Sequence, residues 1–334
     1  MAKKLQAAFF PSINNLLDYL NCETDYYGEY SGEEYRRNPS GTGIYSDVKG
    51  TVTATEKQIG GDYDKYNDGM FFDRWERDGK VYTSYGVRED GYDNGPFISA
   101  TDTNTSFYMY KNKAYNGFYV TVFDDGRFYI TNYTNGLCDG KGLWYEDGYL
   151  FFIPLDREGR VGRAFSKIYI GKQFDFPFTS LVAPRRSYNN NMVCRDYSDC
   201  TIAGQIEYGQ FNGYGIVRFD NDNQYVGQFL DGKFTGIGFQ QIGTHRVFGK
   251  FHDSRATGNA MFYYDDNTVS FGNFNQLKID GTNFDYYPKT NRIYLQCKRN
   301  GQLMGNKYRI DLSTFEVTEL DANKNVLNTY EYGY

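Results

Sequence analysis

The sequence predicts a mainly β protein: an elongated, single-layer ribbon of antiparallel β-hairpins with a short N-terminal helix. Two observations predict this fold. A phrase of aromatic residues and glycines recurs at a fixed spacing, and 19% aromatic residues and 37 glycines stand beside only 7 prolines in 334 residues. Such a composition is typical of many short strands joined by glycine turns. A fixed period of this kind indicates a repeat architecture, in which each unit packs on its neighbours.

The recurring phrase is clearest in the second half of the chain, where Tyr225-x-Gly227-x-Phe229 precedes Gly232, Gly236 and Gly238. Its glycines recur at 22 or 23 residues, as from Gly227 to Gly249 and from there to Gly272. Two further copies read Phe248-Gly249-Lys250-Phe251 and Phe271-Gly272-Asn273-Phe274. The same frame occurs 96 residues before the first copy, as Tyr129, Thr131, Tyr133, Gly136, Gly140 and Gly142.

The phrase has a physical explanation as one β-hairpin. Tyr225, Gly227 and Phe229 alternate, so in a strand they share one face. A glycine between two aromatic residues leaves room for a neighbouring ring to lie over the backbone. The Asp231-Gly232 step suits a tight turn, because both residues tolerate positive φ. Since a lone hairpin is only marginally stable in water, successive hairpins must stack on one another.

This phrase on a 23-residue period resembles the MORN (membrane occupation and recognition nexus) repeat. The resemblance is strong over 204–287, clear near 125–148 and weaker over 25–97. The chain departs from the repeat pattern at two positions. Thr131 stands at a glycine position, and Ala260 replaces the second glycine of a Gly-x-Gly. The resemblance implies a structural role in eukaryotic cytoskeletal or ciliary assemblies. Some proteins of this family carry an added catalytic domain, for which 288–334 is too short.

Five consecutive segments follow from these patterns. They are an N-terminal helical segment (1–22), a MORN-like array (23–152), a basic irregular insertion (153–203), a second MORN-like array (204–287) and C-terminal capping strands (288–334). The helix is predicted over 12–20, with Ser12 as its cap and an apolar stripe of Ile13, Leu16, Leu17 and Leu20. This stripe either covers an open end of the sheet or docks a partner.

The insertion reverses the charge of the chain. The whole chain has a net charge of −6, whereas residues 157–195 sum to +6. We consider three roles for this stretch: a solvated loop paired with acidic hairpins, a docking site for an acidic protein, and a site for acidic lipid headgroups. The acidity of the whole chain argues against nucleic-acid and general membrane binding. The basic residues are Arg157, Arg160, Arg163, Lys167, Lys172, Arg185, Arg186 and Arg195.

No pattern in the sequence indicates catalysis, a cofactor or a metal. The two histidines, His245 and His252, belong to no catalytic arrangement, and the glycines belong to the repeat. The run Asp220-Asn221-Asp222-Asn223 starts like a calcium loop but has Tyr225 where the sixth position needs glycine. Five scattered cysteines favour free thiols in a reducing compartment. No apolar run is long enough to span a membrane.

The sequence therefore predicts a non-enzymatic structural or scaffold protein. It would mediate protein–protein assembly or self-association through rows of Tyr and Phe, in a cytoplasmic or cytoskeletal setting with an organellar one as the alternative. A peripheral membrane adaptor that binds acidic lipids through 157–195, and an accessory subunit of a large organellar complex, are the alternative functions. The candidate partner-binding residues are Arg157, Arg160, Arg163, Lys167, Lys172, Arg185, Arg186, Leu16, Leu17 and Leu20.

Overall fold

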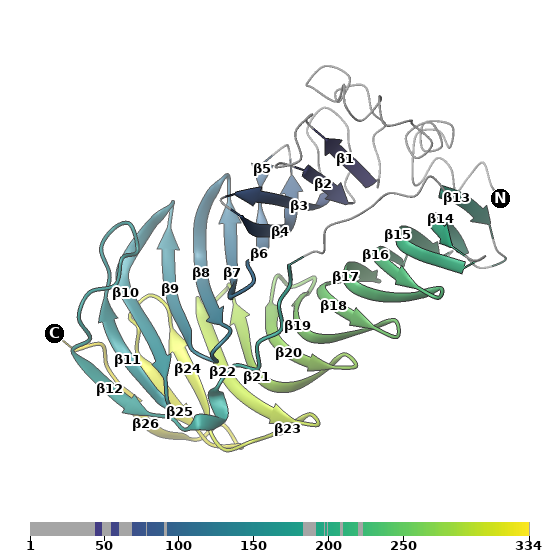
Figure 1. Ribbon diagram of the computed structural model, residues 1–334. Helices are drawn as coiled ribbons and strands as arrows, with labels where there is room; N and C mark the ends of the chain where they lie inside the picture. The colour runs from purple at the N-terminus through teal and green to yellow at the C-terminus, as the bar shows by residue number, and fades with distance from the viewer. Residues whose placement is uncertain are drawn as a thin grey trace. The chain divides into compact units, whose positions relative to one another are not determined.

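A computed structural model describes residues 44–48, 55–59, 69–77, 79–89, 92–182, 192–196, 198, 200–207, 210–219 and 223–333. This part of the chain is mainly β, with antiparallel sheets, as predicted (Figure 1). One 3-10 turn, η2 (Lys172–Phe174), interrupts the strands. The helix predicted over 12–20 lies outside the described residues. In the described part, no helix is long and apolar enough to cross a membrane.

The chain divides into two compact units that are discontinuous in sequence. The first unit comprises Met1–Gly95 and Leu181–Arg255, and the second comprises Pro96–Ser180 and Ala256–Tyr334. Each unit therefore takes residues from both halves of the chain. This division cuts across the five consecutive segments that the sequence suggests.

The first unit contains three groups of antiparallel strands. One hairpin pairs β1 with β2, a second pairs β3 with β4, and β5 adds to β4. The strands β13 to β18 pair in consecutive order. The bounds are β1 (Ile44–Val48), β2 (Thr55–Ile59), β3 (Gly69–Arg77), β4 (Lys80–Glu89), β5 (Tyr92–Asp93), β13 (Met192–Asp196), β14 (Cys200–Glu207), β15 (Gln210–Phe219), β16 (Gln224–Leu230), β17 (Lys233–Ile242) and β18 (His245–His252).

The second unit contains two antiparallel groups, one from each of its chain segments. The first has the order β12-β11-β10-β9-β8-β7-β6, and the second β19-β20-β21-β22-β24-β25-β26, with β23 on β22. The bounds of the first are β6 (Gly95–Ala100), β7 (Asn104–Lys111), β8 (Ala114–Phe123), β9 (Phe128–Thr134), β10 (Leu137–Glu146), β11 (Tyr149–Pro154) and β12 (Ser166–Tyr169). Those of the second are β19 (Arg255–Tyr263), β20 (Val269–Asn275), β21 (Lys278–Tyr287), β22 (Arg292–Arg299), β23 (Gln302–Leu303), β24 (Lys307–Asp311), β25 (Val317–Leu320) and β26 (Val326–Tyr330).

Two-residue turns with positive φ at both residues recur through both units. The turn predicted at Asp231-Gly232 is confirmed, with φ of 49° and 75°. Positive φ at both central residues defines the type I′ turn, whose twist matches that of the flanking strands. Gln276-Leu277 adopts the same geometry without glycine, with φ of 50° and 69°. The turns of this kind include Asn112-Lys113, Asn135-Gly136, Asp231-Gly232, Asp253-Ser254 and Gln276-Leu277.

In each of these hairpins, a glycine with positive φ lies five residues after the first residue of the turn. At Gly236 the pairing register of β16 and β17 shifts, so this glycine forms a β-bulge. The side chain of Gln228 accepts a 2.8 Å hydrogen bond from the amide of Ile237, which follows the bulge. Register shifts also occur at three of the equivalent glycines. The five glycines are Gly117, Gly140, Gly236, Gly258 and Gly281.

In the first unit, the remaining glycines of the phrase form a row across four paired strands. Gly227 lies opposite Gly215 on one neighbour and Gly238 on the other, and Gly238 lies opposite Gly249. The ring of Tyr225 covers this row. A Cβ atom added to Gly238 would lie only 2.7 Å from the Cζ atom of Tyr225, so there is no room for a side chain there. The Tyr225 hydroxyl donates to the carbonyl of Gln228 at 3.0 Å. Here the sheet has the aromatic-over-glycine arrangement that the alternation predicts.

The two sheets of the second unit pack face to face, so the single-layer prediction is wrong for this part of the chain. Phe271 of β20 stacks on Phe107 of β7 at 4.7 Å and on Phe118 of β8 at 5.0 Å. Phe284 of β21 contacts Phe128 of β9 edge to face at 5.2 Å. All five rings are almost fully buried. The core of this unit is therefore a layer of phenylalanines between two sheets, as in a β-sandwich.

The segment after η2 bridges the two sheets of this unit. The amide of Phe176 donates to the carbonyl of Gly126, in the turn between β8 and β9 of the first sheet, at 2.9 Å. On the other sheet, the side-chain amides of Asn273 and Asn259 donate to the carbonyls of Pro177 at 3.1 Å and Thr179 at 3.0 Å. Because side-chain amides satisfy backbone carbonyls here, an irregular segment can lie against both sheets without losing hydrogen bonds.

Candidate interaction surface

The outer face of the sheet β6 to β9 carries a continuous group of aromatic rings. Alternation along each strand turns Phe107 of β7 and Phe118 of β8 toward the core and the tyrosines of both strands away from it. We call the outward rings the outer tyrosine array. Its members are Phe97, Tyr108, Tyr110, Tyr115, Tyr119, Tyr129 and Tyr133.

The rings of the array contact one another from strand to strand. Tyr110 stacks on Tyr115 at 4.7 Å with an interplanar angle of 19°. Tyr108 stacks on Tyr119 at 5.3 Å, and Tyr115 reaches Tyr133 at 5.2 Å. Five of these residues are only half-buried, whereas Phe97 and Tyr108 are almost fully covered. The array is thus ordered by its own stacking while part of its area still faces solvent.

The hydroxyl groups of Tyr119 and Tyr133 in the array remain neutral at physiological pH. Burial raises the pKa of Tyr133 to about 12, and it also raises the pKa of Tyr119. A neutral hydroxyl both donates and accepts hydrogen bonds. Tyrosine therefore offers flat apolar area with a polar tip, at a low cost in side-chain entropy.

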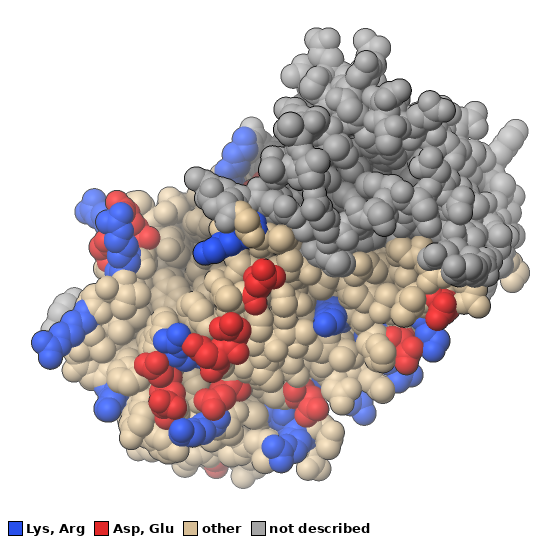
Figure 2. Space-filling model, in the orientation of Figure 1, with Lys and Arg blue, Asp and Glu red and all other residues tan. Residues whose placement is uncertain are grey.

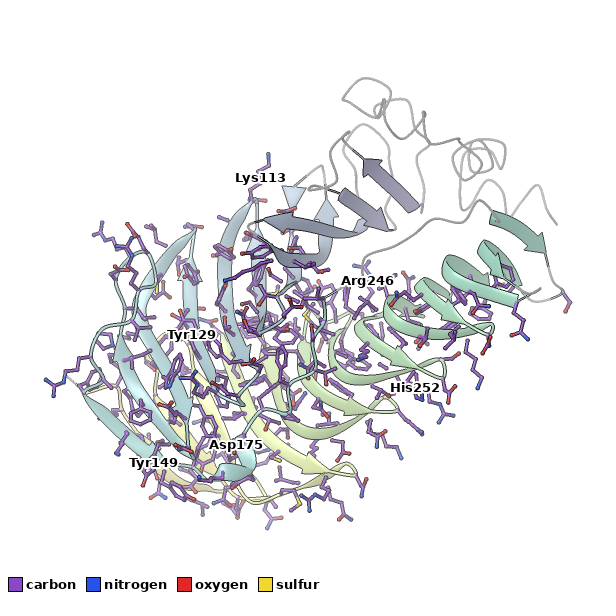
Figure 3. The ribbon with its side chains drawn as sticks, viewed as in Figure 1. Lys113, Tyr129, Tyr149, Asp175, Arg246 and His252 are labelled. Carbon is purple, nitrogen blue, oxygen red and sulfur yellow. The ribbon has the colours of Figure 1, made fainter. Side chains whose placement is uncertain are left out.

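The aromatic face continues beyond the array onto β10 and β11. Trp144 lies beside Phe123, and the guanidinium of Arg127 lies 5.3 Å from the Trp144 ring. Arg127 is also paired with Asp125 at 2.6 Å. Figure 3 shows Tyr129 and Tyr149 on this same sheet. Asp125 thus balances the charge of Arg127, and the aromatic face gains no net charge at this position.

Lys167, one of the predicted partner-binding residues, joins the same face. Its ammonium lies 4.4 Å from the ring centre of Tyr149 and 5.6 Å from that of Phe151. Such cation–π contacts hold a lysine against an aromatic surface. Tyr169 follows on β12 with 62% of its surface exposed. The predicted basic stretch and the aromatic rows, which the sequence treats separately, therefore meet on one sheet.

The loop 155–163 borders the array. Leu155 forms a bridge with Val161, and it packs with Ile153 on Tyr129 and Tyr133. Gly159 lies so close to the array that an added Cβ would be 2.6 Å from the Tyr133 hydroxyl. The loop thus covers the end of the array at Tyr129 and Tyr133.

The other predicted basic residues that the structure describes do not form one cationic patch. Arg160 pairs with Glu158 at 2.5 Å, and Lys172 pairs with Asp147 at 3.3 Å. Arg157 and Arg163 are exposed on the same loop. On the face shown in Figure 2, charged side chains form small groups of both signs, separated by uncharged surface. The remaining predicted residues, Arg185, Arg186, Leu16, Leu17 and Leu20, lie outside the described residues.

The second sheet of this unit carries a polar network on its outer face, which the sequence does not predict. The carboxylate of Asp285 accepts a 2.6 Å hydrogen bond from Ser270 and another from Gln296. Asn283 donates to Ser270 at 3.2 Å and to the carbonyl of Phe271 at 3.0 Å. Removal from water raises the pKa of Asp285. The alternation of Asn283 and Asp285 with Phe284 was the available signal.

Groups suited to catalysis or metal binding are dispersed. His245 and His252 are both exposed, and His252 lies 3.7 Å from Asp253 on a hairpin turn. In the part of the chain that the structure describes, no three His, Cys, Asp or Glu side chains gather in a way that could hold a metal ion. The outer aromatic face is therefore the best-defined candidate site.

Comparisons with known proteins add no family. No protein-family model matches the chain, and no curated protein matches it. Among solved structures, Hsv2 of Kluyveromyces marxianus is 8% identical over 72% of this chain and 96% of its own, with a TM-score of 0.14. Hsv2 of Kluyveromyces lactis is 7% identical with the same coverage and a TM-score of 0.12.

Proposed function

We propose that this protein is a non-enzymatic structural component built from MORN-type hairpins, and that it assembles with protein partners through the outer tyrosine array. The spacing of turn and bulge glycines in both units supports the repeat. The row of glycines under Tyr225 supports it as well. A cytoplasmic or cytoskeletal assembly is the setting that this proposal favours.

The ordered but half-exposed stacking of Tyr110 and Tyr115 is the observation that carries the proposal. Aromatic residues are enriched at protein interfaces, where rigid rings bury much area for little entropy. Contiguous exposed aromatic surface in a folded protein marks interaction sites. The array is also pre-organised, because its rings already contact one another, so a partner pays less to order it.

The electrostatics favour a protein partner over a lipid surface. Anionic membranes attract clusters of uncompensated basic residues. Here Arg160 and Lys172 are already paired with carboxylates, and Lys167 rests on aromatic rings. Flotation with vesicles containing anionic lipid tests the alternative. The proposal predicts no binding that depends on Arg157, Arg160 and Arg163, whereas a loss of binding on changing all three to Glu would favour the membrane adaptor.

Native sedimentation of extracts from the source cells tests the proposal. The double variant Tyr115→Ser/Tyr133→Ser removes two rings of the array but keeps hydroxyl groups there. We expect the wild-type protein in a large assembly and the double variant released from it, at the mass of the purified protein. Tyr287→Ser, at a 41% exposed tyrosine on the other sheet, is the matched control and should sediment like the wild type. A folded double variant that stays in the assembly would overturn the proposal.

A further inference from the structure

The last strand of the second unit, β26, has one unpaired edge. It pairs with β25 through Val317↔Tyr330 and Thr318↔Thr329. Among the strands that the structure describes, none pairs with its other edge. Val326 and Leu327 are 58% and 48% exposed. The backbone donors and acceptors along this edge are therefore available to another strand.

β26 lacks the charges and prolines that normally protect an edge, although its pairing with β25 shifts register at Leu327. Natural edge strands carry charged residues, prolines or bulges that prevent pairing with other chains. The edge strand of the other sheet, β12, is short and contains Lys167. By contrast, β26 reads Val-Leu-Asn-Thr-Tyr, with no charge, proline or glycine. An uncharged, partly apolar edge of this kind is suited to a partner strand.

The strand is also held in an ordered conformation. The side-chain amide of Asn328 donates to Glu319 of β25 at 2.7 Å, and the hydroxyl of Tyr330 reaches the same carboxylate at 3.3 Å. These bonds help to lower the pKa of Glu319, although desolvation acts in the opposite direction. A partner strand would therefore meet a template that is already ordered, which reduces the entropy cost of pairing.

The ends of β26 carry opposite charges. Lys324 precedes the strand and Glu331 follows it, and both are exposed. Lys307 and Asp321 lie near the Lys324 end of the strand and interact electrostatically with each other. Because their charges cancel, the charge of Lys324 leaves this end net positive. In an antiparallel pair of two identical strands, each Lys324 lies toward the Glu331 of the other copy. In a parallel pair, like charges would meet instead.

We propose that β26 pairs in antiparallel orientation with β26 of a second copy of this chain, forming a two-fold dimer with a sheet continuous across both copies. Such an interface is isologous, because the same edge serves both subunits. The inference goes beyond the proposed function, since this edge is a different surface from the outer tyrosine array. A dimer would present two arrays, so that a partner with two sites gains affinity from both.

Sedimentation velocity of the purified full-length chain over a range of concentrations tests the dimer. We expect the wild-type chain to have the mass of a dimer. Leu327→Lys should weaken dimerisation at least about tenfold, because each copy adds a positive charge to the paired edges. Leu137→Lys, at a residue that is 57% exposed on β10, is the matched control and should leave the dimer unchanged.

A charge exchange provides an independent test of the orientation. Lys324→Glu and Glu331→Lys should each weaken the dimer, and the double variant should restore it, because only antiparallel pairing brings these two positions together. A monomer at every concentration would overturn the proposal. So would equal effects of Leu327→Lys and Leu137→Lys, or a double variant as weak as the single ones. Tyr115→Ser/Tyr133→Ser should leave the dimer intact, which separates this result from that of the tyrosine array.

Discussion

Phe107 and Phe271 stack with their ring centres 4.7 Å apart, and this pair joins the two sheets of the second unit. The two residues come from different halves of the chain. Their contact makes this unit a two-layer structure, in which each sheet buries one face and leaves the other outward. Because the phenylalanines serve the core, the tyrosines on the opposite face of β7 and β8 are left for other roles.

Replacing Phe271 with Ala should destabilise the protein by about 3–5 kcal/mol, because the ring is fully buried among Phe107, Phe118 and Phe284. Urea unfolding followed by circular dichroism measures this change. Leu137→Ala, at an exposed position, should cost less than about 0.5 kcal/mol. Equal effects of the two substitutions would contradict the sandwich.

Gly238→Ala should cost about 1–3 kcal/mol, since its new methyl group would collide with the ring of Tyr225. The double variant Tyr225→Ala/Gly238→Ala should lose less stability than the sum of the two single variants, because the collision is absent once the ring is removed. Thermal unfolding of the four proteins gives the coupling free energy. Strictly additive effects would show that the ring does not depend on the glycine.

The free energy of unfolding should depend on pH through Asp285. Removal from water raises its pKa, so the folded state keeps a proton that the unfolded state releases near its ordinary pKa of about 4. Between the pKa of Asp285 in the unfolded state and its higher pKa in the folded state, the folded protein binds more protons than the unfolded one. The stability that this group contributes therefore falls as the pH rises through that window. The Asp285→Asn variant should not show this fall. The difference between its free energy of unfolding and that of the wild type should therefore increase as the pH rises across that window.

Asp266→Asn provides a control of opposite sign for the pH experiment. Hydrogen bonds from the backbone and side chain of Thr268 lower the pKa of Asp266, so its stabilising effect is present above about pH 4 and is lost as the pH falls. Urea unfolding at several pH values measures both difference curves. Identical curves for the two variants would contradict the assigned environment of Asp285.

The hairpin could be predicted from the sequence, whereas the pairing of sheets could not. Tyr225, Gly227 and Asp231-Gly232 encode a strand and a turn locally, so their structure follows from alternation and from backbone preference. Gln276-Leu277 contains no turn residue and still forms the same turn, because pairing of β20 with β21 outweighs local preference. The sequence also did not distinguish Gly236, which forms a bulge, from Gly238, which makes room for a ring.

The candidate site was predictable in composition but not in place. Aromatic rows and the basic residue Lys167 are visible in the sequence, but their meeting on one face depends on which strands pair. The pairing of Arg160 and Lys172 with carboxylates also depends on turns that come together only in the fold. Since such contacts are non-local, periodicity along the chain carries little information about them.

Site-specific photocrosslinking in the source cells tests the central claim most directly. A benzoyl-phenylalanine in place of Tyr115 would sit within the outer tyrosine array, and one in place of Leu277 would sit on an exposed turn of the other sheet. We predict that Tyr115 yields a discrete protein adduct, that Leu277 does not, and that Tyr133→Ser reduces the yield at Tyr115. Equal labelling at both positions, or no protein adduct at Tyr115, would contradict a role for the array in assembly.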